Sequence, residues 1–201
     1  MRQIIITALA AALAAFLPLS LRAKETLPAA DSKIVYIGRT LASGGEVSFD
    51  WSGVYARVSF SGSSLSLRAG DSRHNLYNVW LDRPMSEEPD KIISIQGQDT
   101  VINLFTSKEL EARYGRGRKA LAALKTVTLQ KRTEGEQGRT VFKEFTTDGA
   151  FAQAPGPKER VIEFIGDSYT CGYGTENSVK TDGFTLESEN QNKTYACLAA
   201  R

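Results

Sequence analysis

Short runs in which apolar and polar residues alternate fill the chain from Lys33 to Phe145, and this pattern restricts the fold more than any other feature. From Val54 to Phe60, for example, every second residue is apolar. A period of two is typical of a strand with one buried face. About eight or nine such runs, separated by turns, predict an antiparallel β-sandwich of the jelly-roll type.

Two glycine-containing turns inside this region predict hairpins. Lys91–Gln96 and Thr100–Phe105 flank Gly97-Gln98-Asp99, and Thr126–Arg132 and Thr140–Phe145 flank a second such turn. We therefore expect the two runs of each pair to be neighbours in one sheet. Helical patterns in this region occur at Glu109–Tyr114 and Lys119–Leu124.

Four aromatic residues in the β-rich region allow two interpretations. Trp51, Tyr55, Tyr77 and Trp80 either form a platform on which sugar rings stack, or pack the core and edges of the sandwich. The second interpretation is favoured because aromatic residues are enriched in strands. The basic residues between Arg113 and Lys119 are likewise interpreted as a solvated loop rather than an anion site, since no phosphate-binding motif accompanies them.

Residues 1–23 have the pattern of a secretory signal peptide. Arg2 provides a basic start, the stretch from Ile4 to Leu17 is apolar apart from one threonine, and Ala23 is a small residue suited to cleavage. The alternative is an uncleaved anchor, but Pro18 and Arg22 interrupt the stretch, so we expect no stable membrane anchor. These features predict a periplasmic or secreted protein.

The charge balance and the few metal-binding residues restrict the partners. The chain has 25 Lys and Arg against 23 Asp and Glu, and removal of residues 1–23 with Arg2 and Arg22 leaves 23 of each sign. A neutral chain gives no electrostatic reason to bind nucleic acid. Two Cys and one His exclude a zinc ribbon or a site built from several histidines. We therefore expect no metal or other cofactor and no nucleic-acid partner.

A change of pattern follows residue 149 and predicts a second domain. Residues 150–158 contain Pro155 and Pro157 and are predicted to be a linker, because proline has a fixed φ and no N–H donor. The expected organisation is a sandwich over 31–149 and a separate domain from 159. Arg160–Ile165 is a compact apolar run typical of a buried strand in a parallel sheet, and a helical stretch lies near Asn192–Arg201.

Gly166-Asp167-Ser168 follows this run and suits a nucleophile. Gly166 permits a sharp turn, and Ser168 would lie at the carboxyl edge of the sheet, where α/β folds bind their ligands. The backbone N–H of Ser168, near a helix N-terminus, would stabilise a developing oxyanion. The alternative interpretation is that Ser168 caps the helix.

The stretch from Ile162 to Gly174 resembles the first conserved block of SGNH (GDSL-type) hydrolases, and Phe164–Gly174 is particularly similar to carbohydrate esterase family 2, the acetyl xylan esterases. Phe49–Val54 and Val127–Glu134 also resemble segments of that family's jelly-roll domain, so that the resemblance covers roughly residues 34–201. It implies a multi-domain β plus α/β fold, in which the β-sandwich is followed by the start of an α/β/α SGNH hydrolase domain.

The resemblance also implies a chemistry. Ser168 would be the acyl-forming nucleophile and an oxyanion donor, and the partner would be an acetylated plant-wall polysaccharide or oligosaccharide. The family's catalytic His and its other oxyanion donors have no matching positions, and the one His of the chain, His74, lies far upstream. A Ser hydroxyl without a base is a weak nucleophile. We therefore expect an incomplete hydrolase domain over 159–201 that is inactive by itself; the alternative is a non-catalytic carbohydrate-binding β-sandwich module.

The two cysteines of the chain are candidates for a disulfide bond. Cys171 lies three residues after Ser168, and Cys197 lies in the helical stretch that follows. A secreted protein permits a disulfide between them, and two buried thiols are the alternative.

Overall fold

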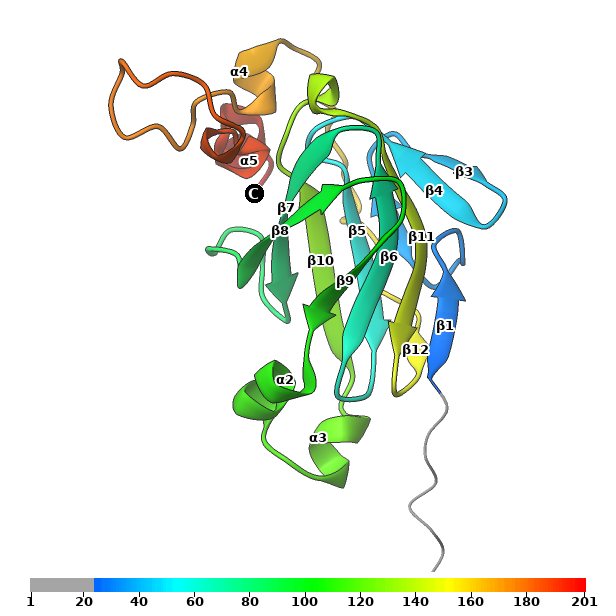
Figure 1. The fold of residues 1–201 in the computed structure, drawn as a ribbon. Coiled ribbons are helices and arrows are strands. Elements are labelled where there is room, and N and C mark those ends of the chain that lie inside the picture. The colour runs from blue at the N-terminus through cyan, green and yellow to red at the C-terminus, as the bar shows by residue number, and fades with distance from the viewer. Residues whose placement is uncertain (1–23) are drawn as a thin grey trace, which may run out of the picture.

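Two antiparallel six-stranded sheets form most of the structure, a computed structural model that describes residues 24–201 (Figure 1). The predicted signal peptide, residues 1–23, lies outside the described residues. In the first sheet the strand order is β3-β4-β11-β6-β9, and β1 pairs with β11; in the second the order is β12-β5-β10-β7-β8, and β2 pairs with β5. The predicted antiparallel β-sandwich is therefore confirmed.

The strands of the first sheet are β1 (Glu25–Pro28), β3 (Leu41–Ser43), β4 (Glu46–Phe49), β6 (Leu65–Asp71), β9 (Thr100–Phe105) and β11 (Thr140–Thr147). Those of the second are β2 (Val35–Ile37), β5 (Tyr55–Phe60), β7 (His74–Leu81), β8 (Lys91–Gln96), β10 (Lys125–Lys131) and β12 (Phe151–Ala152). The helices are α2 (Ser107–Tyr114), α3 (Arg118–Ala122), α4 (Ser168–Cys171) and α5 (Tyr195–Ala200), with 3-10 turns η2 (Gly135–Gln137), η3 (Leu186–Ser188) and η4 (Gln191–Lys193).

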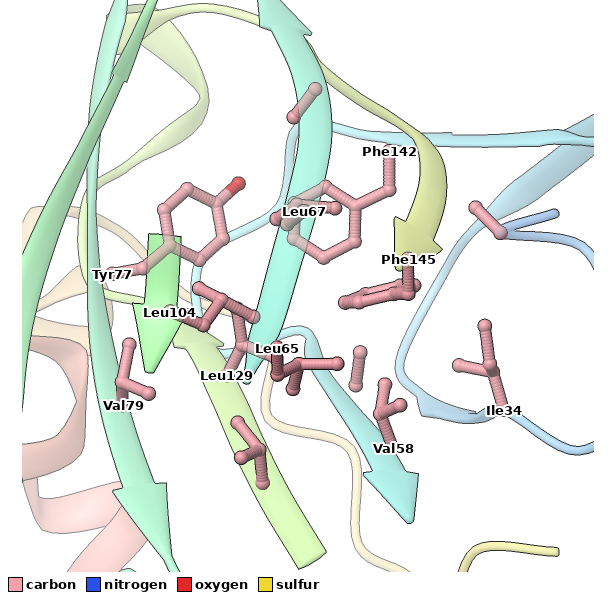
Figure 2. Close-up of a cluster of buried hydrophobic side chains, with 14 of the residues drawn as sticks. Ile34, Val58, Leu65, Leu67, Tyr77, Val79, Leu104, Leu129, Phe142 and Phe145 are labelled. Atoms are coloured by element: carbon pink, nitrogen blue, oxygen red, sulfur yellow. The ribbon is translucent and has the colours of Figure 1, made fainter. Parts of the chain in front are cut away.

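The core lies between the two sheets, where the apolar side chains of both meet (Figure 2). Phe142 on β11 is at its centre: its ring lies 5.0 Å from that of Phe49 and 5.7 Å from that of Tyr77, which comes from the opposite sheet. The Tyr77 hydroxyl donates to Thr140 Oγ1 at 2.6 Å, so that its polar atom has a partner inside the core. The period-two pattern in the sequence corresponds to one buried face on strands such as β8, whereas β7 and β10 are buried on both faces.

Both predicted hairpins are wrong. β8 pairs with β7 and β9 pairs with β6, so the turn at 97–99 carries the chain from one sheet to the other. The same is true of β10 and β11, which belong to opposite sheets. Alternation and turn residues look alike whether the next strand pairs with its predecessor or crosses to the facing sheet. The crossing at 97–99 passes so close to β6 that a Cβ at Gly70 would lie 2.3 Å from the Gln98 carbonyl oxygen.

The two predicted helices of this region are confirmed as α2 and α3, and both lie at the end of the sandwich opposite α4 and α5 (Figure 1). A capping box starts α2: Thr106 Oγ1 accepts from the Glu109 N–H, and the Glu109 carboxylate accepts from the Thr106 N–H at 2.8 Å. Arg113, in the last turn of α2, donates to Asp90 at 2.8 Å. This basic residue is therefore part of an ion pair.

Candidate active site around Ser168

The chain after the sandwich does not form the parallel sheet predicted for it. All strand pairs in residues 24–201 are antiparallel, and the predicted strand Arg160–Ile165 forms neither a strand nor a helix. Ile165 is 78% exposed. A strand forms when a neighbour satisfies its backbone groups, and residues 160–166 make no backbone hydrogen bond to any other part of residues 24–201. The residues 150–158, predicted as a linker, also differ, because β12 pairs Phe151 and Ala152 with β5.

Ser168 is the first residue of α4, and it is exposed. The capping role belongs to Asp167 instead, whose carboxylate accepts from the Tyr169 N–H at 3.1 Å. Neither the hydroxyl nor the N–H of Ser168 has a hydrogen-bond partner within residues 24–201. Both groups therefore remain available to a ligand.

Gly166 is required by a close approach. A Cβ at this position would lie 2.1 Å from Thr170 Oγ1, and that hydroxyl is 2.8 Å from the Tyr195 hydroxyl. The backbone before Ser168 therefore packs directly onto the side of α4. The hydrogen bond between the Thr170 and Tyr195 hydroxyls links α4 to α5. Sequence reasoning assigned Gly166 to a sharp turn, whereas the structure explains it by packing.

Arg132, which follows β10, binds residues 166–201, the segment containing Ser168, at the outer face of the second sheet. Its side chain is 3% exposed. The guanidinium donates to the main-chain oxygens of Glu189 at 3.1 Å and Glu187 at 2.9 Å, and to Asn78 Oδ1 at 3.1 Å. An ion pair to Glu176 at 3.5 Å completes its contacts. A buried cation needs such a set of acceptors, because its desolvation is costly.

Amide side chains from the sheet extend this contact. Asn78 Nδ2 donates to Asn190 Oδ1 at 2.9 Å, and Gln130 Nε2 donates to Gln191 Oε1 at 3.0 Å. Asn78 and Gln130 are both fully buried under residues 190–197. Sequence reasoning missed these residues, because polar side chains on the outward face of a sheet are also expected where that face is solvated.

The backbone of Asn190 connects this contact to the helix that begins at Ser168. The Asn190 N–H donates to the Gly172 carbonyl at 3.1 Å, directly after α4. Thr175 Oγ1 donates to the same carbonyl at 2.9 Å. A chain of hydrogen bonds thus runs from Arg132 and Asn78 on the sandwich, through Asn190, to the helix that begins at Ser168.

Packing, and not a sugar platform, explains most of the predicted aromatic group. Tyr77 and Trp80 are fully buried, and Trp80 Nε1 donates to the Glu87 carbonyl at 2.9 Å. Tyr55 is half-buried beside the Arg57 guanidinium. Trp51 alone of the four is exposed, at 55%, and the Arg39 guanidinium lies 5.7 Å from its ring centre.

The remaining candidates have ordinary environments. Cys171 and Cys197 are both free thiols, as in the second of the two alternatives, but each is half-buried rather than buried. Partial burial raises the pKa of each. His74 Nε2 is 2.8 Å from Ser94 Oγ and makes no hydrogen bond to Ser168. Within residues 24–201 no group of three His, Cys, Asp or Glu side chains is placed to hold a metal ion. The same residues include no helix long and apolar enough to cross a membrane.

Residues 36–155 match the family model for the carbohydrate esterase 2 N-terminal domain. The chain belongs to carbohydrate esterase family 2. Among its curated relatives, the cellulase/esterase CelE of Acetivibrio thermocellus is 31% identical over 75% of this chain and 17% of its own length. An acetylxylan esterase / glucomannan deacetylase of Cellvibrio japonicus is 26% identical over 88% of this chain and 46% of its own length. The chain thus spans less than half of these family 2 relatives.

Solved structures of family 2 esterases have the same fold. The enzyme from Cellvibrio japonicus superposes with a TM-score of 0.75 at 24% identity, over 89% of this chain and 49% of that one. The enzyme from Clostridium thermocellum, solved in complex with cellohexaose, superposes with a TM-score of 0.70 at 30% identity, over 84% of this chain and 47% of that one. The β-sandwich is therefore the fold of the family's N-terminal domain.

Proposed function

We propose that this chain belongs to an esterase that removes acetyl groups from plant-wall polysaccharide, with Ser168 as the nucleophile. The observation that supports the proposal is the placement of Ser168: it is exposed at the start of α4, its hydroxyl is unpartnered, and Asp167 takes the capping role. Relatives named acetylxylan esterase / glucomannan deacetylase support the substrate class. The segment that contains Ser168 would be the beginning of the family's SGNH domain.

The proposed reaction proceeds through an acetyl-enzyme. Ser168 Oγ bonds to the acetyl carbonyl carbon and loses its proton to a base, and the Ser168 N–H donates to the developing oxyanion. The C–O bond to the sugar then breaks, the sugar oxygen takes a proton, and water hydrolyses the acetyl-Ser168 ester to acetate. His74, the one histidine of the chain, hydrogen-bonds Ser94 and not Ser168. We therefore propose that the base for Ser168 comes from outside these 201 residues and that the chain by itself is inactive.

The test joins this chain to the part of the family that it does not span. Residues 24–201 are fused to the matching C-terminal half of the Cellvibrio japonicus acetylxylan esterase, and hydrolysis of an aryl acetate is measured. We expect turnover in the fusion, a loss of about 10³-fold or more in Ser168→Ala, and no Ser168-dependent hydrolysis by the unfused chain. Equal rates for the fusion and its Ser168→Ala variant would contradict the proposal.

A second candidate function, carbohydrate binding without catalysis, is favoured by the exposure of Trp51. One face of its ring is covered by Arg39, which Glu163 holds through hydrogen bonds of 2.6 and 3.0 Å. The exposed part of such a ring is suited to stacking on a sugar. Affinity electrophoresis in xylan and glucan gels tests this function: retardation that is lost in Trp51→Ala but kept in Leu41→Ala, a change at another exposed apolar residue, would support it.

Secretion is part of the proposed function, since the substrate is extracellular. We propose that residues 1–23 direct export to the periplasm or the medium and are then removed. Intact-mass analysis of the exported protein is expected to give a chain that begins after Ala23. A mature protein that still carries Met1 would contradict this prediction.

A further inference from the structure

Glu189 is buried at the contact between the sandwich and the segment that contains Ser168. It directly follows η3 and is 0% exposed. Its Oε1 accepts from the Glu134 N–H at 2.9 Å, whereas its Oε2 has no hydrogen-bond partner. Within residues 24–201 no other buried side-chain nitrogen or oxygen lacks a partner. Such an atom in a native structure calls for an explanation.

Lys131 and Arg132, the two cations whose charges act on Glu189, form no ion pair with its carboxylate. Lys131 Nζ donates to the main-chain oxygens of Thr133 at 2.7 Å and Glu134 at 2.9 Å. Arg132 contacts the main-chain oxygen of Glu189 and forms its ion pair with Glu176. A buried carboxylate with one hydrogen bond and no ion pair is costly, and the neutral acid costs much less.

We infer that Glu189 is a proton-binding site that controls how firmly the Ser168 segment is docked on the sandwich. When Glu189 is protonated, the neutral acid fits the buried contact and the segment stays docked. When Glu189 loses the proton, its carboxylate is more stable in water than in the buried contact. The segment therefore undocks and exposes the carboxylate. The inference does not depend on whether Ser168 is a nucleophile.

The direction of the pH dependence follows from the environment of Glu189. Burial, and then the like charge of Glu134, raise the pKa of Glu189 from its usual 4.5 to about 7. A group whose folded-state pKa is raised stabilises fully below its unfolded pKa, and that contribution is lost as the pH rises through the folded value. Docking is therefore tightest near pH 5 and weakens toward pH 7.5.

Of the other titratable groups around the contact, Glu134 contributes in the same direction as Glu189, because burial and then the charge of Glu136 raise its pKa. Lys131 and Cys171 do not produce this dependence. Burial lowers the pKa of Lys131 to about 8, so its contribution is lost as the pH falls through 8 and is nearly constant between pH 5 and 7.5. Burial raises the pKa of the Cys171 thiol, which stays neutral in this range. The remaining groups that act on Glu189, Glu134 or the two cations are Asp50, Asp71, Glu88, Glu136, Glu176 and Glu187.

Hydrogen exchange of the full chain, followed by mass spectrometry between pH 5 and 7.5, tests the inference. After correction for intrinsic exchange, the opening constant of residues 186–198 is expected to rise roughly tenfold or more over this range. Residues 140–147 in β11 serve as the internal reference and are expected not to change. In Glu189→Gln most of the dependence should be lost, and in the matched control Glu187→Gln, an exposed residue two positions away, it should remain.

Three results would overturn the inference: a flat profile in the wild-type chain, an unchanged profile in Glu189→Gln, or loss of the dependence in Glu187→Gln. If Glu189→Gln leaves the segment unprotected at every pH, Glu134→Gln keeps the test decisive. Removal of this like charge lowers the pKa of Glu189, so the midpoint of undocking should move to lower pH. An unmoved midpoint would then overturn the inference.

Discussion

Phe142→Ala is expected to lower the free energy of unfolding by about 3–5 kcal/mol, the usual cost of truncating a large core aromatic. Phe142 is fully buried and its ring contacts those of Phe49, Tyr77 and Phe145, so the change leaves a cavity between the two sheets (Figure 2). Urea unfolding, followed by tryptophan fluorescence and by circular dichroism, measures the loss.

Val101→Ala is the matched control, because Val101 lies on β9 of the same sheet but is exposed. It is expected to change the free energy of unfolding by less than about 0.5 kcal/mol. A loss below about 1 kcal/mol in Phe142→Ala would mean that this residue is not at the centre of the core.

Arg132→Met is expected to detach the segment containing Ser168 while the sandwich stays folded. The variant keeps an apolar stem but removes four contacts: three hydrogen bonds, to Glu189, Glu187 and Asn78, and the ion pair to Glu176. Removing one partner of a buried charge network costs about 3–5 kcal/mol. We expect this cost to weaken the free energy with which residues 166–201 dock on the sandwich. Limited proteolysis should then cut within 176–190, and amides of residues 186–198 should lose protection.

Arg116→Met provides the control, since Arg116 is an exposed arginine paired with Glu111 on the surface. Surface ion pairs of this kind contribute about 0–1 kcal/mol, so this variant should resemble the wild type. Unchanged proteolysis of Arg132→Met, or unfolding of its whole sandwich, would contradict the role assigned to Arg132.

The sequence predicted the elements of the sandwich better than their arrangement. Alternation located β8 and β9 at their observed bounds, because one face of each strand is apolar. Their partners were not predictable, because the same alternation occurs whether a strand pairs with its predecessor or with a distant strand. An apolar composition also suggested a strand at Arg160–Ile165, but a strand requires a neighbour, and composition carries no information about one.

The candidate site was predictable only in part. Ser168 was expected at the start of a helix, and it is there. The contact that fixes its segment was missed, because Asn78, Gln130 and Arg132 look like ordinary outward-facing strand residues until the C-terminal segment covers them. Glu189 was missed for a related reason: its burial results from tertiary packing, and nothing in its sequence neighbourhood distinguishes it from the exposed Glu187.

The most direct test of the proposed function is covalent labelling of the nucleophile. The fusion of residues 24–201 with the C-terminal half of the Cellvibrio japonicus enzyme is treated with a fluorophosphonate, digested and analysed by mass spectrometry. We predict one adduct per chain, located on Ser168, with loss of aryl-acetate hydrolysis in proportion to labelling and no adduct at that peptide in Ser168→Ala. An active fusion that is labelled at another residue, or that loses activity while Ser168 stays unmodified, would contradict the assignment of Ser168 as the nucleophile.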